Sequence, residues 1–439
     1  MKPLHKAICT SLLLPAATAS LSARNGDRPM NILFILADDF GYECLGANGS
    51  TYETECLDAL ARQGILFENC HSQPLSTPSR VQLMTGRYND RNYTDFAYLD
   101  PKERTFAHMA KELGYATCIA GKWQLGYDKR LPEVFGFDRY CLWQLTKKAG
   151  DGERYADVLY EKDGKMMPRS IDVYGPDVFS DYIEDFIVEN KERPFFAYYP
   201  MVLTHDPFMP TPDSDEWEKP ELRQVRDPKN MADMVKYTDK IVCHLIDVLE
   251  REGLRENTIV FFVGDNGTHP KILTPMKDGS VIQGGKWSTT RYGTHVPMIV
   301  SCPALLESGT VNSNLIDFSD FYVTLRDIMG GDGKNDNELD GISFWPQLLG
   351  KKAGIREMSF CHYQWINKIN YERFAQTIEY KLYQDGRFFN TVEDPLEKNP
   401  IDVGNEDKKI KKLHSRLQKL LDSRPAWGKG ILDRKGGKK

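Results

Sequence analysis

Beyond its N-terminal segment, this 439-residue chain contains no stretch long and apolar enough to cross a membrane as a helix. It also lacks a large excess of charge of either sign, because 57 Lys and Arg against 63 Asp and Glu leave a net charge of −6. This balance gives no reason to expect a nucleic acid or an anionic membrane surface as a partner. An anionic substrate would have to be held by a local cluster of cationic residues.

Paired cysteines at metal-binding spacing are also missing. The sequence has nine cysteines and no C-x-x-C pair, which argues against a zinc site or thioredoxin-like redox chemistry. Outside the cytoplasm some of these cysteines are expected to form disulfides, but the sequence does not say which ones.

The first residues have the pattern of an export signal. Lys2 and Lys6 precede a short apolar core from 7 to 15, and Ala-Thr-Ala at 17–19 is typical of a cleavage site. Cys9 lacks the small residues that usually precede a lipid-modified cysteine. We therefore expect a signal peptide at 1–19 and a periplasmic or secreted protein without a membrane anchor.

Apolar runs that alternate with helical patterns indicate the fold class. The length exceeds what one core usually organises, so a large domain with a smaller one is expected. Runs at 32–36 and 259–263 are typical of buried strands, and "CLDALARQGILF" and "MVKYTDKIVCHLIDVLEREG" are helical. The alternation predicts an α/β fold with a large, mostly parallel sheet flanked by helices.

Four of these runs stop at polar residues. The run at 32–36 ends at Asp38 and Asp39, and the run at 259–263 ends at Asp265 and Asn266. Two further runs end at Lys122 and His205. Because ligands of such sheets bind beyond the carboxyl ends of the strands, we expect all six side chains at one site.

The residue types predict a metal and an anion at this site. Three carboxylates and one amide (Asp38, Asp39, Asp265 and Asn266) are oxygen ligands that suit Ca²⁺ more readily than Mg²⁺. Lys122, Lys286, Arg80 and His205 supply donors for an anion. The implied chemistry is transfer of a tetrahedral oxyanion group on a metal.

The stretch "PLSTPSRVQLMTGR" places Ser76 near the start of a helix. Pro78 suits a first helical turn, so Ser76 is expected just ahead of the helix, where free N–H groups favour an anion, with Arg80 one turn along. An N-cap serine beside a solvated arginine would give the same pattern.

The motifs together resemble those of the type I, formylglycine-dependent sulfatases. "STPSRVQLMTGR" resembles their formylglycine signature in its serine form. "ILADDFGYECLG" and "VGDNG" are similar to the metal motifs, and "GKWQLG" and "GGKWSTTRYGTHVPMIV" to the lysine motifs. "LDGISFWPQLLG" and "YKLYQDGRFFNTVEDPLEKNP" resemble the end of the catalytic domain and the C-terminal subdomain. The resemblance implies an alkaline-phosphatase-like fold with a catalytic domain at 27–350 and an α+β subdomain at 351–439.

The resemblance also implies a role for each motif residue. An anaerobic radical maturase would oxidise Ser76 to formylglycine, whose hydrate attacks sulfur and later expels sulfate without a second attack at sulfur. Ser76 would complete the metal sphere of Asp38, Asp39, Asp265 and Asn266. Arg80 would hold the diol, Lys122 and Lys286 would bind sulfate oxygens, and His205 would protonate the leaving alkoxide.

Two positions depart from the family pattern. Gln124 stands where the family usually has a histidine that assists expulsion of sulfate, and glutamine accepts no proton at neutral pH. His269 or a water would then be the base. Arg291 replaces a residue that is often acidic, which adds positive charge near the entrance and favours a polyanionic substrate.

Other functions remain open from the sequence alone. One is a phosphomonoesterase or phosphodiesterase of the same superfold that uses an unmodified Ser76, and another is a sulfoglycan-binding protein without turnover. For a sulfatase, export indicates a sulfated carbohydrate, such as a glycosaminoglycan, mucin or algal glycan fragment. "RYNDRNYTDFAYLDP" and "CHYQWINKINYERF" are typical of sugar-binding loops, or of loops packed by their own aromatics.

Overall fold

The computed structural model describes residues 29–147, 150–336, 338–364 and 371–425. The predicted signal peptide at 1–19 lies outside them, as do residues 365–370 of the second aromatic-rich segment. None of the helices in the described ranges combines the length and the apolar character needed to cross a bilayer.

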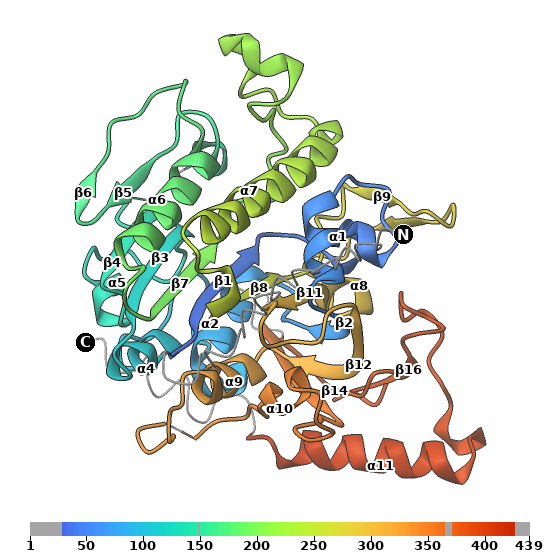
Figure 1. Cartoon of the computed structure of the whole chain (residues 1–439). Coiled ribbons are helices and arrows are strands. Elements are labelled where there is room, and N and C mark those ends of the chain that lie inside the picture. Colours follow the sequence, from blue (N-terminus) through green and yellow to red (C-terminus); the bar gives the residue numbers. More distant parts are fainter. Residues whose placement is uncertain (1–28, 148–149, 337, 365–370, 426–439) are drawn as a thin grey trace, which may run out of the picture.

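A ten-stranded mixed sheet in the order β12-β2-β11-β8-β1-β7-β3-β4-β5-β6 forms the centre of the molecule (Figure 1). Neighbouring strands run parallel from β8 to β4, whereas β11 is antiparallel to both of its neighbours. The strands are β1 (Asn31–Ala37), β2 (Ile65–His71), β3 (Ala116–Lys122), β4 (Arg139–Trp143), β5 (Tyr160–Lys162), β6 (Lys165–Met166), β7 (Phe195–Pro200), β8 (Thr258–Gly264), β11 (His295–Ser301) and β12 (Thr310–Asp317).

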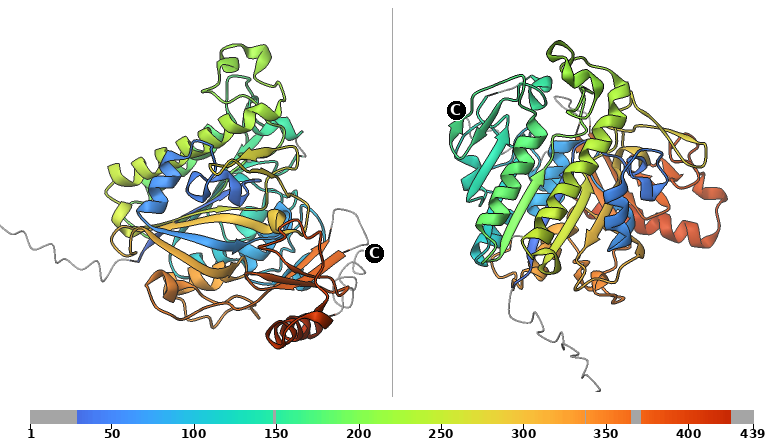
Figure 2. Two further views of the ribbon diagram at one scale, coloured as in Figure 1. Left: turned by 90° about the vertical axis from the view of Figure 1, so that its right-hand side faces the viewer. Right: turned by 45° about the horizontal axis from the view of Figure 1, so that its top comes forward.

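Helices cover both faces of this sheet (Figures 1 and 2). One face carries α1 (Glu55–Arg62), α6 (Gly175–Glu189) and α7 (Met231–Arg251), and the other carries α2 (Ser76–Thr85), α4 (Phe106–Glu112) and α9 (Asp320–Ile328). Four short helices are α3 (Asn89–Asn92), α5 (Leu131–Val134), α8 (Arg291–Thr294) and α10 (Trp345–Leu348).

Strand β1 shows why the sheet is buried on both faces. Ile32, Phe34 and Leu36 pack in one apolar cluster, and the intervening Leu33 and Ile35 pack in the other. Alternate side chains of a strand point to opposite faces, so a continuous apolar run is what a sheet covered on both sides requires. The predicted α/β fold class is thus confirmed.

A second, four-stranded antiparallel sheet lies wholly after residue 350. It consists of β13 (Ser359–Gln364), β14 (Tyr371–Gln376), β15 (Tyr380–Tyr383) and β16 (Phe388–Asn390), and α11 (Lys408–Ser423) packs against it. All described residues of the second aromatic-rich segment therefore belong to paired strands. A two-stranded ribbon, β9 (Leu273–Pro275) and β10 (Val281–Gln283), completes the strands.

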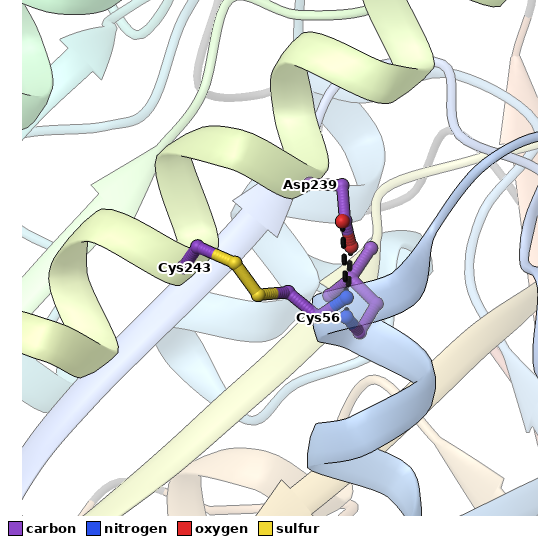
Figure 3. Close-up of a disulfide and its surroundings, with 4 residues drawn as sticks. Cys56, Asp239 and Cys243 are labelled. Carbon is purple, nitrogen blue, oxygen red and sulfur yellow. Dashed lines mark hydrogen bonds between the residues drawn. A yellow bond between two sulfur atoms is a disulfide. The ribbon is translucent and has the colours of Figure 1, made fainter.

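One disulfide joins two helices on the same face of the large sheet. Cys56 of α1 is bonded to Cys243 of α7, and the carboxylate of Asp239 accepts the backbone N–H groups of Cys56 and Leu57 at 3.0 and 2.8 Å (Figure 3). The other six cysteines of the described residues are buried and unpaired. This pairing was not predictable from the spacing, because the two cysteines are 187 residues apart.

Candidate active site

The predicted site residues gather at one edge of the large sheet. Asp38 and Asp39 follow β1, Asp265 and Asn266 follow β8, and Lys122 is the last residue of β3. These strands are parallel, so their carboxyl ends meet at the same edge. All five side chains are buried.

Ser76 lies in the middle of this cluster. It is the first residue of α2, one position further into the helix than the sequence indicated, and Pro78 occupies the first turn. Its hydroxyl Oγ is 3.2 Å from Asp38 Oδ1 and 3.1 Å from Asn266 Oδ1, and it accepts a hydrogen bond from Lys122 Nζ at 3.0 Å. The N-cap alternative is excluded, because the N-cap residue is Leu75.

Two cations neutralise Asp38. Lys122 Nζ donates to both of its carboxylate oxygens at 2.7 and 2.8 Å, and Arg154 Nη1 donates at 3.1 Å. Burial alone would raise the pKa of Asp38, but the charge of Lys122, with those of Arg80 and Arg154, holds it well below its usual range. Burial lowers the pKa of Lys122 to about 8 against the attraction of Asp38.

Arg80 is bound to the second strand end. Its Nη2 donates to Asp265 Oδ2 at 3.1 Å, and both side chains are at most 1% exposed. The other oxygen of Asp265 accepts the backbone N–H of Asp39 at 2.9 Å. Burial and the nearby charge of Asp38 raise the pKa of Asp265 to about 6 despite Arg80.

Lys286 and His205 form a pair on the other side of the cluster. Lys286 Nζ lies 2.5 Å from Asp39 Oδ2 and 2.9 Å from His205 Nε2. His205 Nδ1 contacts the carbonyl oxygen of Asp206, which fits a neutral ring with its proton on Nδ1 and its lone pair toward Lys286. Burial, with the charges of Arg154 and Lys286, holds the pKa of His205 well below its usual range.

Three residues at or next to the site have a left-handed backbone conformation. Asp39, Gln124 and Trp287, which adjoins Lys286, have φ values of 57°, 55° and 74°. Non-glycine residues rarely adopt this left-handed region, and such residues recur at functional sites where the surrounding structure holds them. Gly264, before Asp265, lies so close to Phe40 that a Cβ would overlap its carbonyl oxygen. The turn into the second metal motif therefore requires glycine.

The two departures from the family pattern occupy different places. Gln124 lies beside the cluster, where its Oε1 is 3.5 Å from the hydroxyl of Thr77. Arg291 is turned away instead, toward Ile378 O at 3.2 Å and Asn69 Oδ1 at 3.4 Å. The guanidinium thus lies between β2 and the turn that joins β14 to β15, and its expected role in attracting a polyanionic substrate stays a prediction.

His269, predicted as a substitute base, lies near the Lys286 side of the cluster. Its ring contacts Trp287 edge-on with centroids 4.9 Å apart, and its Nδ1 accepts the backbone N–H of Lys271 at 3.1 Å. Among the described residues, no hydrogen bond joins His269 to Ser76. Burial lowers its pKa, which keeps the ring neutral at pH 7.

The donor set fits a hard divalent cation. Ligand atoms of Asp38, Asp39 and His205 lie within 4.8 Å of one another, and Asn266 Nδ2 donates to Asp39 Oδ1 at 2.8 Å, which turns Asn266 Oδ1 toward Ser76. Carboxylate and amide oxygens without sulfur are the ligands that Ca²⁺ takes. Asp38, Asp39, Asp265 and Asn266 would hold such an ion beside Ser76 Oγ.

Arg154 is a site residue that the sequence analysis missed. It is fully buried, donates to Asp38, and its guanidinium lies 4.1 Å from the ring centroid of Trp143. The residue ends a short irregular turn between β4 and β5, and no apolar run stops at it. In the sequence, Arg154 stands out only as an arginine before an aromatic residue, and this pattern is too common to identify a site residue.

Glu43 gives a prediction about stability. Its carboxylate is 1% exposed, and burial raises its pKa to about 6 from 4.5, against a smaller opposing effect of the Thr268 hydroxyl. The unfolded chain ionises first, so this group destabilises the fold increasingly between pH 4.5 and 6, by about 2 kcal/mol above that window.

We therefore expect Glu43→Gln to raise the free energy of unfolding by up to about 2 kcal/mol at pH 7.5 and to have little effect at pH 4.5. Urea denaturation at both pH values measures this, with the exposed Glu256→Gln as the control. An equal gain at both pH values would contradict the assignment to charge burial.

Comparisons with known proteins find related sequences and a shared fold. Residues 30–331 match the family model "Sulfatase". The chain is 29% identical over 396 residues to N-acetylgalactosamine-6-sulfatase of Canis lupus familiaris, covering 82% of this chain and 74% of that protein. It is 27% identical over 360 residues to arylsulfatase J of Mus musculus, covering 75% of this chain but only 59% of that relative's length.

Solved structures share the fold. The crystal structure of Ps i-CgsB in complex with k-i-k-neocarrahexaose superposes with a TM-score of 0.76 at 23% identity, over 92% of this chain and 94% of that one. A structure from work on glycosaminoglycan metabolism by Bacteroides thetaiotaomicron gives 0.73 at 23% identity, over 90% and 99% of the two chains. With the family model matching over half of its length, this chain belongs to the sulfatase family.

Proposed function

We propose that this protein is a carbohydrate sulfatase that uses a formylglycine at position 76 and a bound Ca²⁺. One observation carries the proposal: Ser76 Oγ lies within 3.2 Å of Asp38, Asn266 and Lys122, so the residue to be modified is already inside the oxyanion and metal cluster. Named relatives include N-acetylgalactosamine-6-sulfatase, and one structural neighbour is in complex with its substrate D-glucosamine-2-N,6-O-disulfate.

The residues around position 76 have separable tasks in this proposal. A hydrated aldehyde supplies the attacking hydroxyl together with a second one that later allows sulfate to leave. Lys122 donates to the oxygen at position 76, and Arg80 keeps Asp265 in place. Preorganised cations of this kind stabilise negative charge as it develops on a tetrahedral group.

Lys286 and His205 would handle the leaving group. The proton between Lys286 Nζ and His205 Nε2, 2.9 Å apart, is placed to reach the departing alkoxide. Tyr155 fixes the loop that carries His205, because its hydroxyl donates to the carbonyl oxygens of Val202 and His205. We assign His205 as the general acid: its Nε2 would first take a proton from the Lys286 ammonium that contacts it, and would then pass that proton to the alkoxide.

Maturation and export belong to the same proposal. An anaerobic radical maturase would modify Ser76, and the protein would work in the periplasm or outside the cell. The Cys56–Cys243 disulfide supports an oxidising compartment, as does the N-terminal sequence pattern.

Mass spectrometry of the peptide that contains Ser76 tests the proposal. In protein from a host with a serine-type maturase, this peptide should be about 2 Da light, since oxidation to the aldehyde removes two hydrogens. The same preparation should release sulfate from sulfated monosaccharides. An unmodified peptide in fully active enzyme would favour the phosphatase-like alternative, and a modified protein without turnover would favour a binding role.

Gln124 gives a prediction about the kinetics of the second half-reaction, in which sulfate is expelled. If His269 or a water replaces the family histidine, Gln124→Ala should reduce turnover only mildly and product should form without a burst. If nothing replaces it, an initial burst of alcohol equal to the enzyme concentration should precede slow turnover, and Gln124→His should then raise the steady rate. Rapid-quench measurement of alcohol and sulfate distinguishes the cases. We expect the first outcome, because the rest of the site is complete.

A further inference from the structure

A pocket of about 740 Å³ lies beside the catalytic cluster and has no part in the chemistry described so far. Its walls are two loops, residues 94–101 after α3 and residues 126–131 after β3. The volume is within the roughly 300–1,000 Å³ of sites that hold small molecules.

Hydrogen bonds connect the first loop, and the residues just before the second loop, to Thr77, which follows Ser76. The backbone N–H of Ala97 donates to Thr77 Oγ1 at 3.3 Å, and Thr77 Oγ1 is 3.5 Å from Gln124 Oε1. A backbone bond of 3.3 Å from Leu99 to Leu125 joins the two loops directly. The segments that form the pocket are thus connected to Thr77, the residue directly after Ser76.

The lining is aromatic and acidic. Tyr98 and Tyr127 are 37% and 48% exposed, and Phe96, which also lines the pocket, packs against the apolar cluster that contains Leu75. Exposed aromatic faces of this size attract the C–H groups of a ligand's ring, while the tyrosine hydroxyls provide polar contacts.

The charges differ from those of the catalytic cluster. Asp95, Asp100 and Asp128 line the pocket, and none of the described lining residues is a lysine or arginine. Asp128 is paired with Arg130, and Asp100 accepts the backbone N–H of Lys102. Carboxylates accept hydrogen bonds from hydroxyl groups, but they repel a second sulfate or a uronic acid.

We propose that this pocket is a subsite for an uncharged sugar linked to the sulfated residue, so that the enzyme prefers glycans in which sulfate is flanked by a neutral sugar. The inference rests on the proposed function and restricts the expected substrates to glycans of this kind. The cationic cluster takes the sulfate, Tyr98 and Tyr127 hold the ring of the neighbour, and the carboxylates bind its hydroxyl groups.

The test compares matched substrates. Monosaccharide sulfates (the 6-sulfates of galactose, N-acetylgalactosamine and N-acetylglucosamine) identify the sugar accepted, which is then extended by one galactose that is either neutral or sulfated. We expect kcat/KM to rise with the neutral neighbour and to fall with the sulfated one. A preference for the sulfated neighbour would overturn the proposal.

Variants of the lining residues test whether the preference for a neutral neighbouring sugar arises in the pocket. Tyr127→Ala should lower kcat/KM for the neutral disaccharide on the order of tenfold more than for the monosaccharide, from the loss of one stacked ring. Leu305→Ala, 39% exposed after the far end of β11, is the control and should lower both equally or not at all. Asp95→Asn should reduce the difference in kcat/KM between the disaccharides with a neutral and with a sulfated neighbour. Equal losses on both substrates in Tyr127→Ala would also overturn the subsite.

Failure of the proposed function gives a different result. If none of the sulfated sugars is hydrolysed, the catalytic assignment fails, and the subsite is judged by saturation-transfer NMR with the sulfate-free galactose disaccharide. Binding by the wild type that Tyr127→Ala weakens supports the subsite, and no difference between the two proteins overturns it.

Discussion

Lys122→Ala should lower kcat for a sulfate ester by about 10²–10³, the usual loss when one preorganised donor to a developing charge is removed. Its ammonium is the group that touches both Ser76 Oγ, at 3.0 Å, and Asp38, at 2.7 Å. Arg154 remains on Asp38 at 3.1 Å in the variant, so the carboxylate keeps a partner and the fold should survive. Steady-state kinetics on protein with verified modification of Ser76 measure the loss.

Lys381→Ala is the matched control for this variant. Lys381 is equally buried and is paired with Glu397 at the same 2.7 Å, but its Nζ also donates to the carbonyl of Thr289 and touches none of the cluster residues. Removing it should lower stability, with kcat of the folded enzyme close to that of the wild type. A Lys122 variant within tenfold of the wild type would mean that the sulfate is bound elsewhere.

Removal of the metal should have the other large effect. Exhaustive dialysis against a calcium chelator should abolish sulfate release. Without the ion, the three clustered carboxylates are balanced only by the ion pairs with lysine and arginine, which leave fewer positive charges for the sulfate group. Re-addition of Ca²⁺ at 100 times its dissociation constant should restore activity and add about 2.7 kcal/mol of stability. Thermal unfolding with and without Ca²⁺ measures the second effect independently of turnover.

Two variants locate the ion. Asp39→Ala should abolish the calcium-dependent shift in the melting temperature. Glu184→Gln should leave that shift unchanged, although Asp181, Glu184 and His244 form another group with metal-like spacing on the surface. A shift that is lost in Glu184→Gln and kept in Asp39→Ala would place the calcium at the surface cluster instead.

Much of the fold and the site could be predicted from the sequence, because both depend on local patterns. A buried strand reads as a continuous apolar run, and its end is marked by the first polar residues, as at Asp38 and Asp265. Parallel strands share one edge, so four such endings predict one site without any knowledge of the strand order. The predicted start of the helix at Ser76 differed from the structure by only one position, because Pro78 indicates the first helical turn but not the residue that begins it.

Other features depend on contacts between distant segments, which leave no local pattern. Arg154 reaches Asp38 from an irregular turn 116 residues away, and Arg291 donates to Ile378, 87 residues further along the chain. The pairing of Cys56 with Cys243 depends likewise on how α1 and α7 pack.

The sequence by itself therefore determined which functional groups meet at the site: the oxygen atoms of three aspartates and an asparagine, the cationic side chains, and the hydroxyl of Ser76. The tertiary structure alone decided how these charges are paired and what surrounds them. It placed two cations on Asp38, set Lys286 between Asp39 and His205, and formed an acidic, aromatic pocket beside Thr77. Residue types carry functional groups, but charge pairing and pocket shape depend on distances of a few ångström between segments that only folding brings together.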